Sequence, residues 1–216
     1  MTSERFGGVC AVLVGALFIA GLAFLDLPGH DDGEARLNEF YGDSGNRVRV
    51  LLGAFSWALA GIALLGLGAV LTSRAERGGA SAVLTRLMLM ACAVSAVLLM
   101  GAGAAQVPTY ALSIDAFDEP ESELTRATIP HIGYSLLLFS MLGAAAFIAS
   151  VAAAIRGTAM LPAWTGWLGF SAAGLLVLSI IFMPMFALPV WAVAMGVVLL
   201  RAPAVVGPRP GVVLST

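Results

Sequence analysis

Long stretches without a charged residue constrain this chain more than any other feature. No Asp, Glu, Lys or Arg occurs in residues 6–25, 50–73, 87–114, 127–155 or 157–200. Crossing the hydrocarbon core of a bilayer takes roughly 20 helical residues, because each residue advances the helix by about 1.5 Å. Each of the first four stretches therefore supplies one membrane-spanning helix, and the last, with 44 residues, supplies two.

The sequence predicts an all-α fold, a polytopic transmembrane bundle of six helices that forms one membrane domain over residues 1–216. Only 11% of the residues are charged, whereas about a quarter are charged in soluble domains. The expected spans are 7–25, 49–72, 84–106, 131–154, 163–182 and 185–200, with outer loops at 26–48 and 107–130.

Two of these spans have an alternative interpretation. The first also fits a signal peptide, but its uncharged run is longer than the usual apolar core of about 7–15 residues, so we expect a membrane helix. The sixth has about 16 residues, which is short for a crossing. Pro184 and Pro189 allow part of it to be kinked or re-entrant, so whether the last two spans form a complete hairpin stays open.

Charges are divided unevenly between the two sets of connecting segments, and this division predicts the orientation. The expected outer loops contain Asp26, Asp31, Asp32, Glu34, Glu39, Asp43, Asp115, Asp118, Glu119, Glu121 and Glu123. The alternate segments carry Arg5, Arg74, Arg77, Arg86, Arg156, Arg201 and Arg209. Basic residues are retained on the cytoplasmic side. We therefore expect both termini in the cytoplasm and a multi-pass protein of the inner (plasma) membrane.

Aromatic residues agree with these boundaries, since amphipathic rings prefer the headgroup level. Trp164 and Trp167 open the fifth span, and Trp191 lies early in the sixth. Trp57 lies deeper within the second span, and we expect it to pack between helices.

A candidate ligand pocket is predicted at the outer end of the bundle. His131 and Tyr134 are three residues apart and share one helix face at the start of the fourth span. The other residues expected to line this pocket are Gln106 and Tyr110 around the end of the third span, Arg47 just before the second and Arg49 at its start. His131 has three interpretations: a ligand of a metal or haem, a hydrogen-bond partner of a quinone, or an interfacial residue bonded to the acidic loop.

Methionines suggest a second candidate site. Met183 and Met185 flank Pro184 in the outer turn between the last two spans, and Met100 lies toward the outer end of the third. Thioether sulfur suits Cu(I). Methionine is also an ordinary filler of irregular apolar space, and both interpretations stay open.

No motif in the sequence specifies a chemistry. The HExxH and GxSxG patterns are absent, and the expected spans contain no carboxylate or basic residue between their ends, which disfavours proton coupling. We expect a non-catalytic accessory or binding protein that holds a lipid or another apolar small molecule near the outer leaflet. The sequence predicts the lipid bilayer as a partner and no nucleic acid. It identifies no cofactor and does not reveal the oligomeric state.

Two alternatives remain. One is a transporter of an uncharged or soft-metal solute, because Leu52–Ser56 is echoed by Leu168–Ser171 three helices later, as in inverted repeats. The other is a haem or quinone redox protein that uses His131 and Tyr134.

One stretch of sequence carries a family resemblance. The run Leu161-Pro162-Ala163-Trp164-Thr165-Gly166-Trp167-Leu168-Gly169 opens the fifth span, Tyr41 and Arg47 precede the second, and Arg201 follows the segment Trp191 to Leu200. In these features the chain resembles a large group of uncharacterised bacterial six-helix membrane proteins, classed as a domain of unknown function. An Arg often follows the Pro in that group, where this chain has Ala163. The resemblance implies the fold and no activity, and therefore no site residues.

Overall fold

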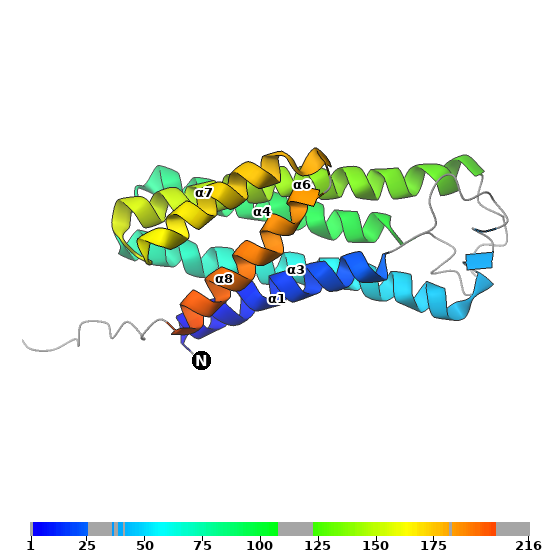
Figure 1. Ribbon diagram of the computed structural model, residues 1–216, viewed down its shortest axis with the longest axis horizontal. Coiled ribbons are helices and arrows are strands. Elements are labelled where there is room, and N and C mark those ends of the chain that lie inside the picture. Colours follow the sequence, from blue (N-terminus) through cyan, green and yellow to red (C-terminus); the bar gives the residue numbers. More distant parts are fainter. Residues whose placement is uncertain are drawn as a thin grey trace, which may run out of the picture.

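The computed structural model describes residues 2–25, 36, 39–40, 42–107, 123–181 and 183–201, and these residues form helices joined by short turns, with no strand among them (Figure 1). Of residues 123–130, 180 and 183 only the backbone is described. The α-helices are α1 (Ser3–Phe24), α3 (Ser44–Arg77), α4 (Ala82–Ala105), α6 (Glu123–Thr158), α7 (Ala163–Val177) and α8 (Ala187–Arg201). Two 3₁₀ turns, η1 (Ser179–Ile181) and η2 (Met183–Phe186), join α7 to α8.

Five helical stretches are long and apolar enough to cross a membrane, which is the pattern of a multi-pass membrane protein. They are Ser3–Phe24, Ser44–Arg77, Ala82–Ala105, His131–Thr158 and Pro184–Arg201. The predicted all-α bundle is confirmed at this level. The second and fourth helices are longer than their predicted spans, since α3 has 34 residues and α6 has 36.

Of these α-helices, α7 and α8 are the shortest, with 15 residues each. The predicted fifth span, 163–182, is wrong at its end, because α7 stops at Val177 after 15 residues. The backbone tightens into 3₁₀ geometry at η1 and again at η2, where Pro184 lacks the N–H that an α-helix needs. The predicted sixth span instead belongs to an apolar stretch of 18 residues, Pro184–Arg201.

Polar side chains begin three of the helices. The first N–H groups of an α-helix have no partner within it, and a short polar side chain at the preceding position accepts a hydrogen bond from one of them. Thr2 accepts from the Arg5 N–H, Asp43 from the Gly45 N–H at 2.8 Å, and Ser81 from the Leu84 N–H at 3.3 Å. The turn between α3 and α4 contains Gly79 with φ +86°, a backbone conformation that favours glycine.

Most helices pack against their neighbours along the chain, and α8 returns to pack against α1. The contact between α7 and α8 is small by comparison, because α7 lies mainly on α6 while α8 lies mainly on α1. In Figure 1, α7 and α8 meet at the turn that joins them and diverge toward the end of the bundle where α1 begins.

Small residues allow the close contacts. A methyl group on Gly196 of α8 would lie 3.0 Å from the carbonyl oxygen of Gly8 on α1, so only glycine fits there without displacement. Between α4 and α6, the Ser95 hydroxyl donates to the Ser140 carbonyl at 2.9 Å, and the Ser140 hydroxyl donates to the Ser95 carbonyl at 2.8 Å. Both serines are fully buried, so these reciprocal bonds satisfy hydroxyls that lipid cannot.

Two tryptophans show where the aromatic predictions succeed and fail. Trp57 packs between helices as predicted, since it is buried, stacks on Phe18 and donates its indole N–H to the Phe18 carbonyl at 3.3 Å. The prediction for Trp191 is wrong: this side chain is 1% exposed and meets Phe147 of α6 edge to face, with ring centroids 6.0 Å apart. The indole also lies against Gly169 of α7, so it packs between α8 and the α6–α7 pair.

One end of the bundle collects most of the arginines. We call it the arginine end, and it holds the start of α1, the end of α3, the start of α4, the end of α6, the start of α7 and the end of α8. The arginines described there are Arg5, Arg74, Arg77, Arg86, Arg156 and Arg201, and the acids described there are Glu4 and Glu76. The arginine-bearing segments that alternate with acidic segments along the sequence are thus brought together at one end of the bundle.

Candidate binding cleft at the arginine end

A cleft of about 780 Å³ lies between α7 and α8 at the arginine end. The α6–α7 turn and Trp164 near the start of α7 form one side, the last turns of α8 form the other, and the cleft also reaches Arg74 of α3. The volume falls within the range of about 300–1,000 Å³ that is usual for small-molecule sites. Trp164 and Val197 line the cleft, and their side chains are 54% and 38% exposed. The cleft therefore opens onto the exposed surface of the bundle.

The walls of the cleft are mostly apolar. The turn between α6 and α7 supplies Ala159, Met160, Leu161 and Pro162, and α8 supplies Ala194, Val197 and Val198. Two guanidinium groups, those of Arg74 and Arg201, are the charged members of this lining. The cleft therefore combines a hydrocarbon surface with positive charge at one end.

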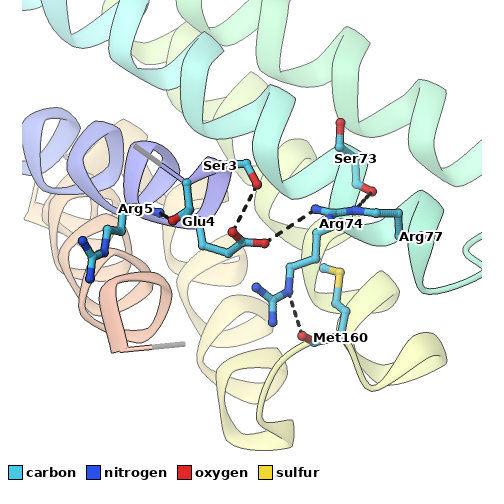
Figure 2. Close-up of polar contacts among 8 residues, drawn as sticks. Ser3, Glu4, Arg5, Ser73, Arg74, Arg77 and Met160 are labelled. Carbon is cyan, nitrogen blue, oxygen red and sulfur yellow. Dashed lines mark hydrogen bonds and ion pairs between the residues drawn. The ribbon is translucent and has the colours of Figure 1, made fainter. Parts of the chain in front are cut away.

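Arg74 is held in place by the backbone of the α6–α7 turn. Its Nε donates to the Met160 carbonyl oxygen at 3.0 Å, and Figure 2 shows this bond crossing from α3 to the turn. The side chain is partly buried. Its Nη1 atom is buried and has no hydrogen-bond partner among the described residues. One nitrogen thus fixes the guanidinium while another is left unsatisfied.

Glu4 is an acid at the same end of the bundle, and it pairs with another arginine, Arg77. Its carboxylate lies 3.8 Å from Nη2 of Arg77 and accepts from the Ser3 hydroxyl at 3.1 Å (Figure 2). Glu4 is 5% exposed and is not part of the cleft lining, so the cleft keeps a net positive charge.

The stretch that opens α7 fixes one wall of the cleft against α6. The Thr165 hydroxyl donates to the Pro162 carbonyl at 2.7 Å, within the first turn of α7. Gly166 allows the Arg156 side chain to lie alongside, and the Arg156 guanidinium lies 4.7 Å from the centre of the Trp167 ring, a cation–π contact. With α7 held on α6 in this way, Trp164 is directed into the cleft.

A second groove, of about 640 Å³, lies between α1 and α8 on their outer surface. Its lining is apolar and includes Val12, Ala16, Phe186 and Val190. It shares Ala194 with the cleft, so α8 separates the two spaces. No charged side chain lines it, which distinguishes it from the cleft at the arginine end.

The outer pocket predicted from the sequence is only partly described. Gln106 is buried and lies against Gly133, next to His131 and Tyr134 on α6, so the third and fourth spans do meet there. Tyr110 lies outside the described residues. Arg49 donates to the Ala23 carbonyl at 3.0 Å at the end of α1, and Arg47 is partly buried nearby on α3. The use of these residues as a ligand pocket stays a prediction.

The predicted methionine site also stays a prediction. Met100 lies against Gly61 of α3. A methyl group on that glycine would be 2.7 Å from Cγ of Met100. Met185 is fully buried within η2. The side chain of Met183 lies outside the description. Among the described residues no group of three or more His, Cys, Asp or Glu is placed to hold a metal.

The residues of the cleft were not predicted as a site. Arg74 and Arg201 were evidence of orientation and Trp164 was expected to be an interfacial ring, while Arg201 and Trp164 also belong to the family resemblance. One sequence signal pointed to this region, because Leu161, Pro162 and Trp164 belong to the most specific stretch of the chain. The cleft itself depends on how far α7 and α8 diverge, which no local pattern encodes.

No family model, curated protein sequence or solved structure matches this chain. The resemblance to bacterial six-helix membrane proteins therefore stays a prediction, and the cleft is interpreted from its own geometry.

Proposed function

We propose that this chain is a non-catalytic membrane protein that binds a lipid in the cleft between α7 and α8. The observation that carries the proposal is a cavity of about 780 Å³ with apolar walls that opens beside two helices of a membrane bundle. A helix surface that faces lipid is ordinarily covered by acyl chains, and a cleft of this size allows one lipid to be held more tightly than its neighbours.

We also propose that the arginine end faces the cytoplasm of a bacterial cell. The retention of arginine on the cytoplasmic side supports this orientation, and the gathering of six arginines with two acids at one end of the bundle agrees with it. The lipid would then belong to the cytoplasmic leaflet. The outer-leaflet pocket near His131 would be a separate site.

Native mass spectrometry of the protein released from nanodiscs tests lipid binding. The wild-type protein is expected to keep a lipid adduct. Val197→Trp fills the cleft with an indole, so the fraction of protein carrying lipid should fall at least about fivefold, which corresponds to about 1 kcal/mol. Val97→Trp is the matched control, because Val97 is exposed on α4 and lies outside the cleft lining. No retained lipid in the wild type, or equal loss in both variants, would contradict the proposal.

A transporter of an uncharged or soft-metal solute is the second candidate. The echoed segments make comparable contacts: Gly53 of α3 lies against Phe24 and Leu25 at the end of α1, and Gly169 of α7 lies against Ala152 of α6. Each glycine thus contacts the preceding helix, as copies of an inverted repeat would. The copies differ in length, since α3 has 34 residues and α7 has 15. Solute flux in proteoliposomes that is lost on replacing both Met183 and Met185 by Leu would favour transport over binding.

A further inference from the structure

The charge in the cleft identifies the kind of lipid, and this step rests on the proposed function. A buried guanidinium nitrogen without an acceptor is unfavourable, since it has given up its hydrogen bonds to water without replacing them. Nη1 of Arg74 is such an atom, while Nε of the same side chain is fixed on the Met160 carbonyl. Nη1 is closed to solvent as well as unpaired, so the Arg74 side chain must move slightly toward the cleft that it lines before an acceptor bound there can reach this donor.

The nearby acid leaves this positive charge in place. The Glu4 carboxylate is paired with Arg77 and Ser3, and it lies outside the cleft lining. Arg201, in the last turn of α8, brings a second guanidinium to the cleft from another helix. Two guanidiniums on different helices match an acceptor with several anionic oxygens, because charge-assisted bonds to phosphate are the strongest that arginine makes.

The remaining surface of the cleft selects an amphiphile rather than a free anion. Met160, Leu161, Val197 and Val198 offer hydrocarbon, and the exposed indole of Trp164 is suited to the headgroup level. We infer that the cleft binds an anionic glycerophospholipid, with its phosphate between Arg74 and Arg201 and an acyl chain between α7 and α8.

Competition between two lipids with identical acyl chains tests the inference. The protein is placed in nanodiscs of equal parts dioleoyl phosphatidylglycerol and dioleoyl phosphatidylcholine, and the retained lipid is identified by native mass spectrometry. We expect the wild type to retain phosphatidylglycerol over phosphatidylcholine about five- to tenfold, because the choline cation is repelled by the arginines. Arg74→Gln and Arg201→Gln should each lower this ratio, and the double variant should bring it close to one.

Arg86→Gln is the matched control, because Arg86 is an exposed arginine at the same end and does not line the cleft. Arg201→Lys keeps the charge and should retain a preference for phosphatidylglycerol, which separates loss of charge from loss of folding. A double variant that still prefers phosphatidylglycerol as strongly as the wild type would overturn the inference while leaving lipid binding intact. Equal retention of the two lipids by the wild type would do the same.

Two further outcomes separate the inference from the proposed function. Loss of all lipid from the wild type would overturn both, whereas loss of lipid in Val197→Trp with no effect of the arginine variants would overturn only the choice of headgroup. Inorganic phosphate is expected not to displace the lipid, since the apolar walls add nothing to its binding. Displacement by millimolar phosphate would show that the arginines bind a free anion, against the inference.

Discussion

Single glycines decide how closely these helices approach. A methyl group on Gly103 of α4 would lie 2.6 Å from the carbonyl oxygen of Ala54 on α3, and that oxygen belongs to backbone that cannot move alone. Gly101, two residues earlier, has open space around it, and its nearest neighbour would be Leu136 Cδ1 at 3.6 Å. The two positions therefore share a helix and a chemical type but differ in what surrounds them.

This difference predicts opposite results for the same substitution. Gly103→Ala should lower the free energy of unfolding by about 1–3 kcal/mol, because the added methyl pushes α3 and α4 apart. Gly101→Ala should leave it unchanged or raise it by up to about 1 kcal/mol, because alanine favours helix over glycine. Equilibrium unfolding in mixed detergent micelles measures both. Equal effects of the two substitutions would contradict the close contact at Gly103.

At the scale of elements, the turn between α6 and α7 controls one wall of the cleft. After α6 ends at Thr158, Ala159 adopts φ +51° while its N–H donates to the Ile155 carbonyl at 3.0 Å. A helix commonly ends in this left-handed conformation, and glycine usually occupies the position because a side chain is strained there. The turn is nevertheless held, since Met160, the next residue, accepts the bond from Arg74.

Relief of this strain is measurable. Ala159→Gly should raise the thermal stability in detergent, by roughly 0.5–1 kcal/mol at the melting temperature, since the backbone strain exceeds the extra entropy lost by glycine. Gly79→Ala in the turn between α3 and α4 provides the reverse experiment. Its φ is +86° and no atom lies within 4 Å, so strain alone should destabilise the protein by about 1 kcal/mol. A destabilising Ala159→Gly would argue against the left-handed turn.

Much of the element pattern follows from the sequence, because charges rarely enter a bilayer. The charge-free runs place α1, α3, α4 and α6 and reveal the length available to α7 and α8. They do not reveal that α7 ends at Val177, since the residues that follow are equally apolar and only the backbone geometry changes. The burial of Trp191 could not be predicted for a related reason. The sequence gives its position along the helix, but whether its side chain faces lipid or the core depends on which helices α8 contacts.

The cleft was beyond prediction for the same physical reason. Small residues at helical spacing occur in every span, so the sequence does not say which pairs meet. Gly166 and Gly169 turn out to hold α7 on α6, while Gly8 and Gly196 hold α8 on α1. The divergence of α7 and α8 results from these two separate choices of partner.

At the scale of the whole molecule, the distribution of charge and the arrangement of the helices both support one orientation of the bundle in the membrane. Helices that alternate in direction bring six arginines to one end, so the proposed orientation is a property of the complete bundle. The natural cysteines, Cys10 and Cys92, are both buried, which leaves the surface free for introduced thiols.

Labelling of introduced cysteines tests this orientation. Glu76→Cys places a thiol at the arginine end, and Gly42→Cys places one at the opposite end; both positions are exposed. A maleimide that cannot cross membranes should label the Gly42→Cys thiol in intact spheroplasts, and the Glu76→Cys thiol only after the cells are opened. The reverse pattern would invert the topology and place the cleft in the outer leaflet.

The packing of α8 on α1 also has a consequence for how the protein is made. Most other large helix contacts join successive helices and can form as soon as the second member is inserted. The glycine-bearing face of α1 must wait until everything between Phe24 and Ala187 has been translated, which takes roughly 8–30 s at typical rates of elongation. During that interval, Gly8 and Gly15 remain open to whatever helix diffuses past in the membrane. Biogenesis is therefore most vulnerable just before α8 is inserted, when α1 still lacks its long-range partner.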